Sequence, residues 1–222
     1  MSTEGHVAAT EAPHLKHYFS DVDQQSHAVE QGMWIFLVQE ILFFGGLFMA
    51  YVLYRTAFPD AFAAGSHHLD VNLGTLNTGV LLLSSFTMAT AVRATQIHRI
   101  RLTVVSLILT ALLGLVFLGV KAVEYGHKFH ENLVPGPHFH WPGPEVQGHV
   151  QMFYNLYFAT TGLHALHMII GVGLVLALVP RAARGAFNQG HNDPVAMTGL
   201  YWHFVDIVWI FLFPLLYLIG RH

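Results

Sequence analysis

The chain has 222 residues, of which 10% are Asp, Glu, Lys or Arg and 54% are hydrophobic. Because an ordinary soluble domain carries about a quarter of charged residues, this composition excludes a typical water-soluble globular protein. The formal net charge of -3 offers no basic surface for nucleic acid. The absence of cysteine excludes disulfides, iron–sulfur clusters and Cys-ligated copper from this chain.

Long apolar stretches predict membrane-spanning helices. One crossing needs about 20 predominantly apolar residues, and the stretches that satisfy this lie near residues 30–55, 71–93, 102–126, 149–179 and 197–219. Turn-forming Pro and Gly residues lie in several of the connections between them. The sequence therefore predicts an all-α fold, a polytopic membrane bundle of five transmembrane helices.

We expect a single membrane domain over residues 29–222, preceded by a polar segment over residues 1–28. Lys and Arg are enriched on the cytoplasmic side of membrane proteins. The side of the N-terminus collects Lys16, Arg93, Arg99, Arg101, Arg181 and Arg184, against Arg55, Lys128 and Arg221 on the other. This bias predicts a cytoplasmic N-terminus, an outer or periplasmic C-terminus, and an extended outer loop over residues 128–148.

The first span contains one deeply placed carboxyl group, that of Glu40. An ionisable side chain inside a membrane span is costly, so it must be paired, hydrated or functional. Two interpretations stay open. Glu40 is either a proton-exchanging or ligand-contacting carboxyl, or it makes a structural hydrogen bond to another helix.

The third span ends in a pair of opposite charges, Lys121 and Glu124, three residues apart. Side chains at this spacing lie on one helix face, so we expect a structural salt bridge at the membrane boundary. Beyond it, the outer loop and its edges carry histidines at positions 127, 130, 138, 140 and 149. Their spacing is irregular, so a solvated or partner-facing loop is favoured over a metal site.

The last two spans each contain a polar pair at helical spacing. His164 and His167 are three residues apart and share a helix face, as do His203 and Asp206. Two imidazoles can ligate a metal or heme, but further ligands would be needed. We therefore expect interhelical or lipid-headgroup contacts for the histidine pair, and a self-satisfying pair for His203 and Asp206. No metal site and no catalytic residue are expected.

Segments of all five spans, taken in chain order, resemble subunit III of heme-copper terminal oxidases, the cytochrome c oxidase subunit 3 family. The matching segments are EILFFGGLF (40–48), LNTGVLLLSS (76–85), EY (124–125), ATTGLHALHMIIG (159–171) and YWHFVDIVWIFLF (201–213). The resemblance extends over roughly residues 29–220. It matches the five-helix bacterial members, because the two helices that precede the Glu40 helix in seven-helix members are missing here.

This resemblance implies a non-catalytic subunit of the bacterial cytoplasmic membrane, without heme or copper of its own. Those cofactors belong to the partner subunits I and II, which reduce O2 to water and pump protons. The family subunit supports proton uptake and stability of the catalytic subunit and binds phospholipid. Glu40 matches its buried carboxylate, and the candidates for lipid binding are Glu40, His167, Arg181 and Arg184.

Two departures from the family pattern carry expectations of their own. Lys121 stands where many members have Gln, and the long loop over residues 128–148 suggests an additional subunit or an electron-donor complex on the outer face. Cytochrome c is favoured as donor because this loop lies on the side where that donor docks. The alternatives are a subunit III of a quinol oxidase or a nitric-oxide-reductase-associated homologue, a heme b carrier using His164 or His167 with His203, and a proton-coupled transporter using Glu40.

Overall fold

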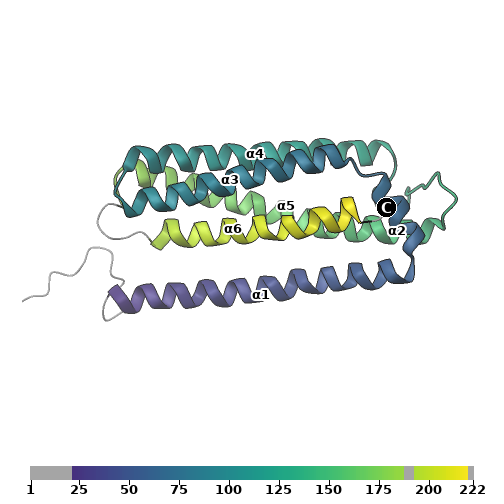
Figure 1. Cartoon of the computed structure of the whole chain (residues 1–222), viewed down its shortest axis with the longest axis horizontal. Coiled ribbons are helices and arrows are strands. Elements are labelled where there is room, and N and C mark those ends of the chain that lie inside the picture. The colour runs from purple at the N-terminus through teal and green to yellow at the C-terminus, as the bar shows by residue number, and fades with distance from the viewer. Residues whose placement is uncertain (1–21, 188–192, 220–222) are drawn as a thin grey trace, which may run out of the picture.

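The structure is a computed structural model that describes residues 22–187 and 193–219, and within these ranges every regular element is helical. The elements are α1 (Val22–Ala57), α2 (Pro59–His67), α3 (Val71–Gln96), α4 (Ile100–His130), α5 (Gln147–Ala183), α6 (Asp193–Phe213) and a π-helical turn, η1 (Pro214–Leu218). Figure 1 shows the long helices side by side. Two parts of the sequence predictions lie outside the described residues. They are residues 1–21 of the N-terminal segment, which include Lys16, and Arg221.

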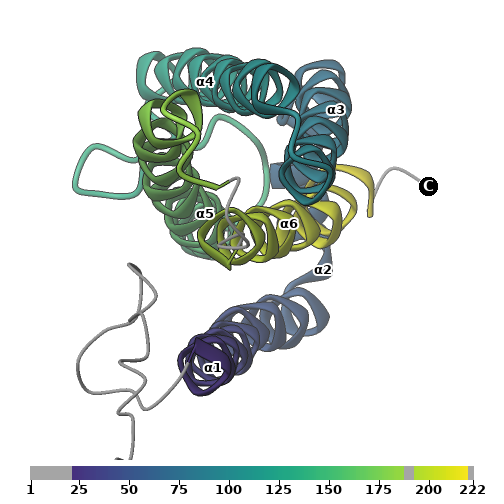
Figure 2. The same ribbon diagram turned by 90° about the vertical axis from the view of Figure 1, so that its left-hand side faces the viewer.

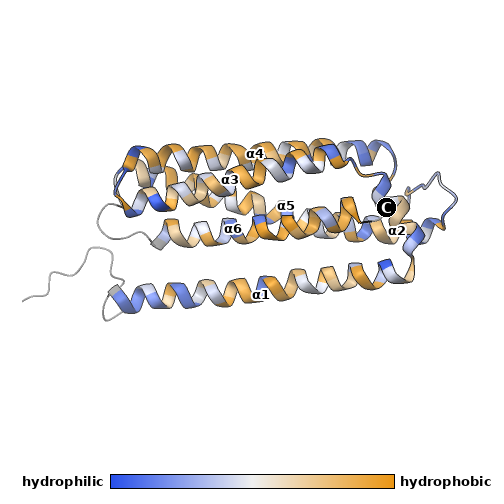
Figure 3. Ribbon diagram, in the orientation of Figure 1, coloured by the Kyte–Doolittle hydropathy of each residue, from blue (hydrophilic) through white to orange (hydrophobic). Residues whose placement is uncertain are grey.

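The prediction of five membrane spans is confirmed. In the described part of the chain, five helices are long and apolar enough to cross a membrane: α1, α3, α4, α5, and α6 with its terminal turn. Figure 3 shows hydrophobic residues along the middle of these helices and hydrophilic residues gathered towards their ends. Large apolar side chains such as Leu42 and Phe86 are 72% and 69% exposed, as expected for surfaces that face lipid.

The helix boundaries differ from the predicted ones. α1 begins at Val22, so residues 22–28 of the predicted polar segment are helical, because a helix started in the membrane continues into a polar stretch without a breaker. For the same reason α4 runs to His130 and α5 begins at Gln147, which shortens the predicted outer loop to residues 131–146. The short helix α2 was missed because Pro and Gly residues in the connections were interpreted as turn-forming, whereas Pro59 occupies the first turn of this helix, a position well suited to proline.

Helices α3 to α6 form a group of four, and α1 lies beside it. Figure 2 shows this group end-on, with α1 on the flank nearest α6. α1 packs against α2, α5 and α6, while the most extensive contact in the chain joins α3 to α4. α1 is thus an edge helix with one face towards the bundle and with most of its other side chains exposed among the described residues.

Large aromatic side chains fill the interior of the four-helix group. The rings of Trp202 and Trp209 are buried almost completely. Gly114 of α4 allows the first of these to approach, since a Cβ atom at this position would lie 2.8 Å from the Trp202 ring. Indole nitrogens need partners when they are buried, and Trp202 and Trp209 donate to Ser84 and Thr78 of α3, both at 3.1 Å.

The positively charged residues separate between the two ends of the bundle. The end formed by the last turns of α3 and α5 and the first turn of α4 carries Arg93, Arg99, Arg101, Arg181 and Arg184. The opposite end, with α2 and the 131–146 loop, has Arg55 and Lys128 among its described residues. The asymmetry counted in the sequence is therefore also an asymmetry in space.

Candidate functional site

The first candidate site is a contact between Glu40 of α1 and His167 of α5. Oε2 of Glu40 lies 3.3 Å from Nε2 of His167, and the two side chains are 12% and 13% exposed. The atoms are within ion-pair distance, yet Oε2 accepts no hydrogen bond of good geometry. Glu40 therefore has a partner on another helix, but that partner does not saturate its carboxyl group.

The other imidazole nitrogen determines which protonation states this pair can adopt. Nδ1 of His167 lies 2.8 Å from the carbonyl oxygen of Leu163. A carbonyl oxygen only accepts, so Nδ1 carries a proton. Nε2 then either donates to an ionised Glu40 or accepts from a protonated Glu40. The 3.3 Å contact is therefore chemically compatible with either arrangement, although it is not a formed hydrogen bond.

Aromatic side chains surround the Glu40–His167 pair. The ring of Phe44 packs edge-on against the imidazole with centroids 5.4 Å apart, and the ring of Tyr201 stacks at 6.4 Å. The hydroxyl of Tyr201 also donates to the backbone carbonyl of His167 at 3.0 Å. This apolar wall limits water near the pair and strengthens the interaction between charges inside it.

The second candidate site is a cluster inside the four-helix group, formed by Lys121, Glu124, Tyr157 and Tyr217 and called here the Lys121 cluster. Nζ of Lys121 donates to Glu124 at 2.9 Å and to the hydroxyls of Tyr157 and Tyr217, both at 3.1 Å. The two hydroxyls donate in turn to Oε1 of Glu124, at 2.8 and 2.5 Å. The cluster joins α4, α5 and the terminal turn η1.

The predicted pairing of Lys121 with Glu124 is confirmed, and the pair is enclosed by the bundle. Each side chain is only 3% exposed. Nζ of Lys121 also lies over the rings of Tyr125 and Trp209, 5.1 and 5.3 Å from their centroids. The ion pair is therefore enclosed by hydroxyls and ring faces, which compensate for the lost hydration of the ammonium group.

His164 and His167 share a stripe of α5 but have different neighbours. The imidazole of His164 is buried against the rings of Phe117 and Trp209, at 5.3 and 5.1 Å, and neither ring nitrogen makes a hydrogen bond. His167 instead faces Glu40 of α1. Side chains three residues apart differ by about 60° in direction around the helix axis. This difference is enough to direct one ring inwards and the other towards α1.

The predicted pair of His203 with Asp206 was wrong. Nδ1 of His203 lies 2.7 Å from the hydroxyl of Ser85 on α3. Asp206 is buried, and neither carboxyl oxygen is in hydrogen-bond geometry with a described residue, although Ser85 interacts with this carboxyl as well. The partner of His203 lies on a neighbouring helix, which sequence spacing alone does not reveal.

The remaining lipid-binding candidates lie apart from the Glu40–His167 pair. Arg181 and Arg184 are exposed at the end of α5. Fourteen residues separate Arg181 from His167, which corresponds to roughly 21 Å along a helix. The four candidates are therefore divided between a buried site in the span and a cationic site at its end.

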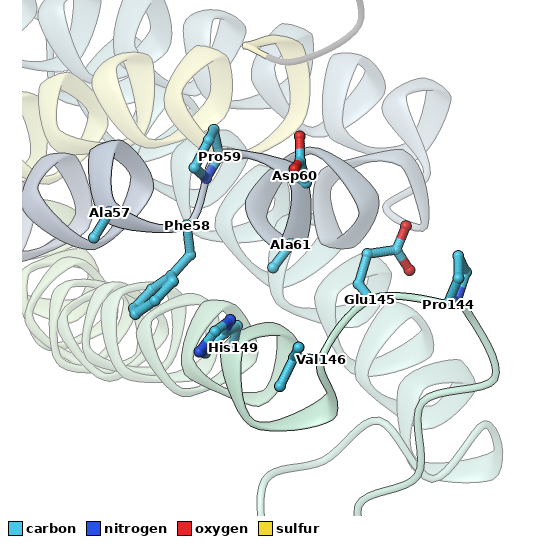
Figure 4. A pocket seen from close by; sticks show the side chains of 9 residues that line it. All are labelled: Ala57, Phe58, Pro59, Asp60, Ala61, Pro144, Glu145, Val146 and His149. Carbon is cyan, nitrogen blue, oxygen red and sulfur yellow. The ribbon is translucent and has the colours of Figure 1, made fainter.

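The opposite end of the bundle contains a cavity of about 360 Å³ between the α1–α2 junction and the start of α5. Figure 4 shows Phe58 and His149 next to each other at this cavity, with Asp60 and Glu145 on the far side. The Phe58 and His149 rings stack with centroids 3.8 Å apart. Nε1 of Trp141 donates to Glu145 at 2.8 Å, and this hydrogen bond lowers the pKa of the Glu145 carboxyl.

Metal-ligand geometry is absent from the described part of the chain. Within residues 22–187 and 193–219, no three His, Asp or Glu side chains lie close enough together to hold a metal ion. The imidazoles of His164, His167 and His203 each pack against different partners. The heme b alternative required two of these rings to face each other, and their contacts do not favour it.

Three polar residues of these sites were not among the predicted site residues. They are Tyr157, Tyr217 and Ser85. A signal was present for Tyr157, which lies seven residues before His164 and so on the same buried face of α5. For Tyr217 and Ser85 the decisive partners lie on other helices, and no spacing within the sequence indicates them.

The chain is similar to known proteins along most of its length. A family described as Cytochrome c oxidase subunit III matches residues 148–221. The cytochrome c oxidase subunit 3 of Thermostichus vulcanus is 34% identical over 194 residues, which cover 86% of this chain and 87% of that protein. The quinol oxidase subunit 3 of Bacillus spizizenii is 32% identical over 194 residues, covering 85% and 86%. The probable quinol oxidase subunit 3 of Staphylococcus saprophyticus is 28% identical over 209 residues, covering 93% and 98%.

Proposed function

The chain belongs to the cytochrome c oxidase subunit III family, and we propose that it supports proton uptake and stability of the catalytic subunit without itself being catalytic. Family membership makes it a multi-pass membrane component of a multi-subunit respiratory oxidase, a heme-copper oxidoreductase. The proposal concerns how this particular chain contributes to that complex, and which of its residues are involved.

The observation that carries the proposal is the Glu40–His167 pair. It brings a carboxyl group and an imidazole to 3.3 Å from each other inside a membrane span, with two aromatic rings beside the imidazole. In contrast to the saturated Glu124, Glu40 retains capacity to accept a proton or a hydrogen bond from another molecule. A group of this kind is suited to buffering or relaying protons for a neighbouring subunit.

Partners and orientation follow from the same assignment. We place the catalytic subunit I and subunit II beside this chain, with heme and copper held by them and none by this chain. The arginines at the end of α3, α4 and α5 favour a cytoplasmic N-terminus in a bacterial cytoplasmic membrane. The C-terminus and the 131–146 loop are then outside, where an additional subunit or an electron donor would contact the loop.

Phospholipid binding forms the second part of the proposal. Arg181 and Arg184 expose two guanidinium groups at the end of α5, at the level where the phosphates of the cytoplasmic leaflet would lie. Guanidinium groups bind phosphate by paired hydrogen bonds. Lipid analysis of the purified complex tests this, because an Arg181→Gln, Arg184→Gln variant should retain less phospholipid than the unaltered chain.

The electron donor is either cytochrome c or quinol. We favour cytochrome c, since the outer cavity and loop lie on the face where a water-soluble donor docks, while the similarity to relatives named for both enzymes keeps quinol as the alternative. Turnover of the purified complex with reduced cytochrome c and with quinol decides between them. Rapid oxidation of quinol alone would overturn our preference without affecting the family assignment.

The role of Glu40 is tested in the purified oxidase with a Glu40→Ala variant. We expect assembly, heme and copper content and electron transfer to stay near normal, while proton uptake changes or activity is lost faster during turnover. Glu30→Ala is the matched control, because Glu30 is an exposed carboxylate on the same helix. If Glu40→Ala behaves like Glu30→Ala in both assays, Glu40 has no such function.

A further inference from the structure

A carboxyl group that the proposed function does not use lies inside the bundle, that of Asp206 in α6. The residue is 3% exposed, and neither carboxyl oxygen is in hydrogen-bond geometry with a described residue. None of the ion pairs among the described residues includes it. An ionised carboxylate without partners is strongly disfavoured in such a place, whereas the neutral acid is not. The surroundings of Asp206 therefore favour its protonated form.

Ser85 of α3 connects this carboxyl group with an imidazole. Its hydroxyl oxygen lies 2.7 Å from Nδ1 of His203, and Ser85 also interacts with the carboxyl group of Asp206. A hydroxyl group has one proton to donate and two lone pairs to accept with, so it can receive a proton from one neighbour while it passes its own to the other. His203 and Asp206 thus share a neighbour on α3, although they are not hydrogen-bonded to each other.

The same imidazole lines a cavity of about 470 Å³ between α1, α3 and α6. The lining residues of α6 extend from Ala196, near its first turn, to the half-buried His203, a distance of roughly 10 Å along a helix. Figure 1 shows the first turn of α6 at the same end of the bundle as the last turn of α3. The cavity therefore leads from the arginine-rich end of the bundle into the membrane span, and His203 lies one helical turn before Asp206.

The lining of this cavity is suited to hold water. Its polar members besides His203 are Glu30, Arg93 and Gln96, and the other lining residues are Ala89, Val92, Ala196, Met197, Gly199 and Leu200. A cavity of this volume has room for several water molecules, and polar groups on its wall keep it from being dry. The charged residues Glu30 and Arg93 are exposed near the ends of their helices, so both reach bulk water directly.

The titratable groups of the neighbouring helices are engaged elsewhere. On α1, Glu40 faces α5. On α5, the imidazole of His164 is enclosed by aromatic rings, and on α4 the Lys121 cluster is closed by its own hydrogen bonds. The groups that can exchange a proton with Asp206 are therefore those on the side of Ser85.

We propose that Asp206 is a proton-binding site that exchanges its proton with water at the arginine-rich end of the bundle, through Ser85, His203 and the cavity between α1, α3 and α6. To load the site, Nε2 of His203 takes a proton from cavity water while Nδ1 releases one to Oγ of Ser85. The hydroxyl proton of Ser85 passes to the carboxylate of Asp206, so one proton leaves the water and one reaches the carboxylate. Unloading reverses these transfers.

This inference goes beyond the proposed function and does not depend on it. The proposed function concerns Glu40 and is tested in the purified oxidase, whereas the exchange at Asp206 is a property of this chain and is measured on it directly. Failure of either test leaves the other proposal standing.

Infrared spectroscopy of the full-length chain in detergent tests whether Asp206 carries an exchangeable proton. A protonated carboxyl group has a C=O stretching band that an ionised carboxylate lacks, and this band shifts when deuterium replaces the proton. At neutral pH, Asp206→Asn should remove one such band, and in the unaltered chain the same band should shift after transfer to D2O. Loss of no band, or a band that never shifts, would overturn the proposal.

The rate of that shift tests the route. His203→Phe should slow the exchange by about tenfold or more, because a phenyl ring has no nitrogen to take up a proton. Ala89→Phe should slow it as well, because Ala89 lines the cavity and the larger side chain fills part of it. Ala122→Phe is the matched control, since Ala122 is an exposed alanine of α4 that does not line this cavity. The proposal is wrong if His203→Phe exchanges as fast as the unaltered chain, or if Ala89→Phe exchanges as fast as Ala122→Phe.

Discussion

Two buried glutamates of this molecule stand in opposite situations. Glu124 accepts hydrogen bonds from Lys121, Tyr157 and Tyr217, at distances between 2.5 and 2.9 Å. Glu40 has an ionisable neighbour on another helix, His167 at 3.3 Å, without hydrogen-bond geometry. Both carboxyl groups are largely removed from solvent by the protein, so burial alone does not separate them.

The difference between the two lies in what each carboxylate can still do. Glu124 joins three elements and has its charge balanced by an ammonium group, so a further ligand would have to break existing bonds. Glu40 is at the contact of the edge helix with the bundle, and its proton can reside on either member of the pair. The contacts are those of a structural residue for the first, while the second has an incompletely bonded carboxyl group, which is the basis of its proposed role in proton exchange.

The largest expected effect comes from leaving Glu124 unpaired. Lys121→Met should destabilise the protein by about 3–5 kcal/mol, because removal of one partner leaves a buried charge without compensation. Unfolding in detergent, followed by circular dichroism, measures this loss. The double variant Lys121→Met, Glu124→Leu should recover most of it. A single variant as stable as the unaltered chain would show that the Lys121 cluster does not stabilise the bundle.

A smaller effect is expected when one hydroxyl of the same cluster is removed. Tyr217→Phe should cost about 1.5 kcal/mol in the free energy of unfolding, the value of a hydrogen bond to a charged group, because Glu124 keeps its other two donors. Tyr54→Phe is the matched control, since Tyr54 is an exposed tyrosine of α1. If both variants lose the same stability, the 2.5 Å bond to Glu124 contributes nothing specific.

Substitution of Glu40 should change the stability of the protein much less than removal of the charged partner of Glu124. Glu40→Gln is expected to change the free energy of unfolding by less than about 1 kcal/mol, because it removes an incompletely formed contact and keeps a polar group of similar shape. The same unfolding measurement applies. A loss as large as that of Lys121→Met would remove the contrast between the two carboxylates and make Glu40 a structural residue.

How much of this contrast the sequence reveals depends on where the partners lie. The five spans and the pairing of Lys121 with Glu124 were predictable, because hydrophobic length and spacing within one helix are local properties. The contact of Glu40 with His167 and that of His203 with Ser85 each join different helices. Their geometry is decided by helix packing, which the periodicity of one chain segment does not encode.

The same limit explains the error at His203 and Asp206. Spacing of three residues makes a local pair possible, but it does not compete successfully with a hydroxyl at 2.7 Å on a facing helix. Similarly, the enclosure of Lys121 depends on residues of other elements. Tyr157 and Tyr217, which lie far apart in sequence, provide an interior environment that makes burial acceptable.

A third carboxylate, Glu145 in the 131–146 loop, extends the comparison to the surface, where the smallest effect is expected. The hydrogen bond from Trp141 lowers its pKa below the ordinary value of 4.5. A lowered pKa in the folded state stabilises the protein above pH 4.5, and this contribution disappears as the pH falls through the folded-state pKa. Glu145→Gln cannot titrate, so the difference in melting temperature between the two proteins should change only in this acidic window. A difference that stays constant from pH 3 to pH 7 would mean that the Trp141 bond does not favour the ionised form of Glu145.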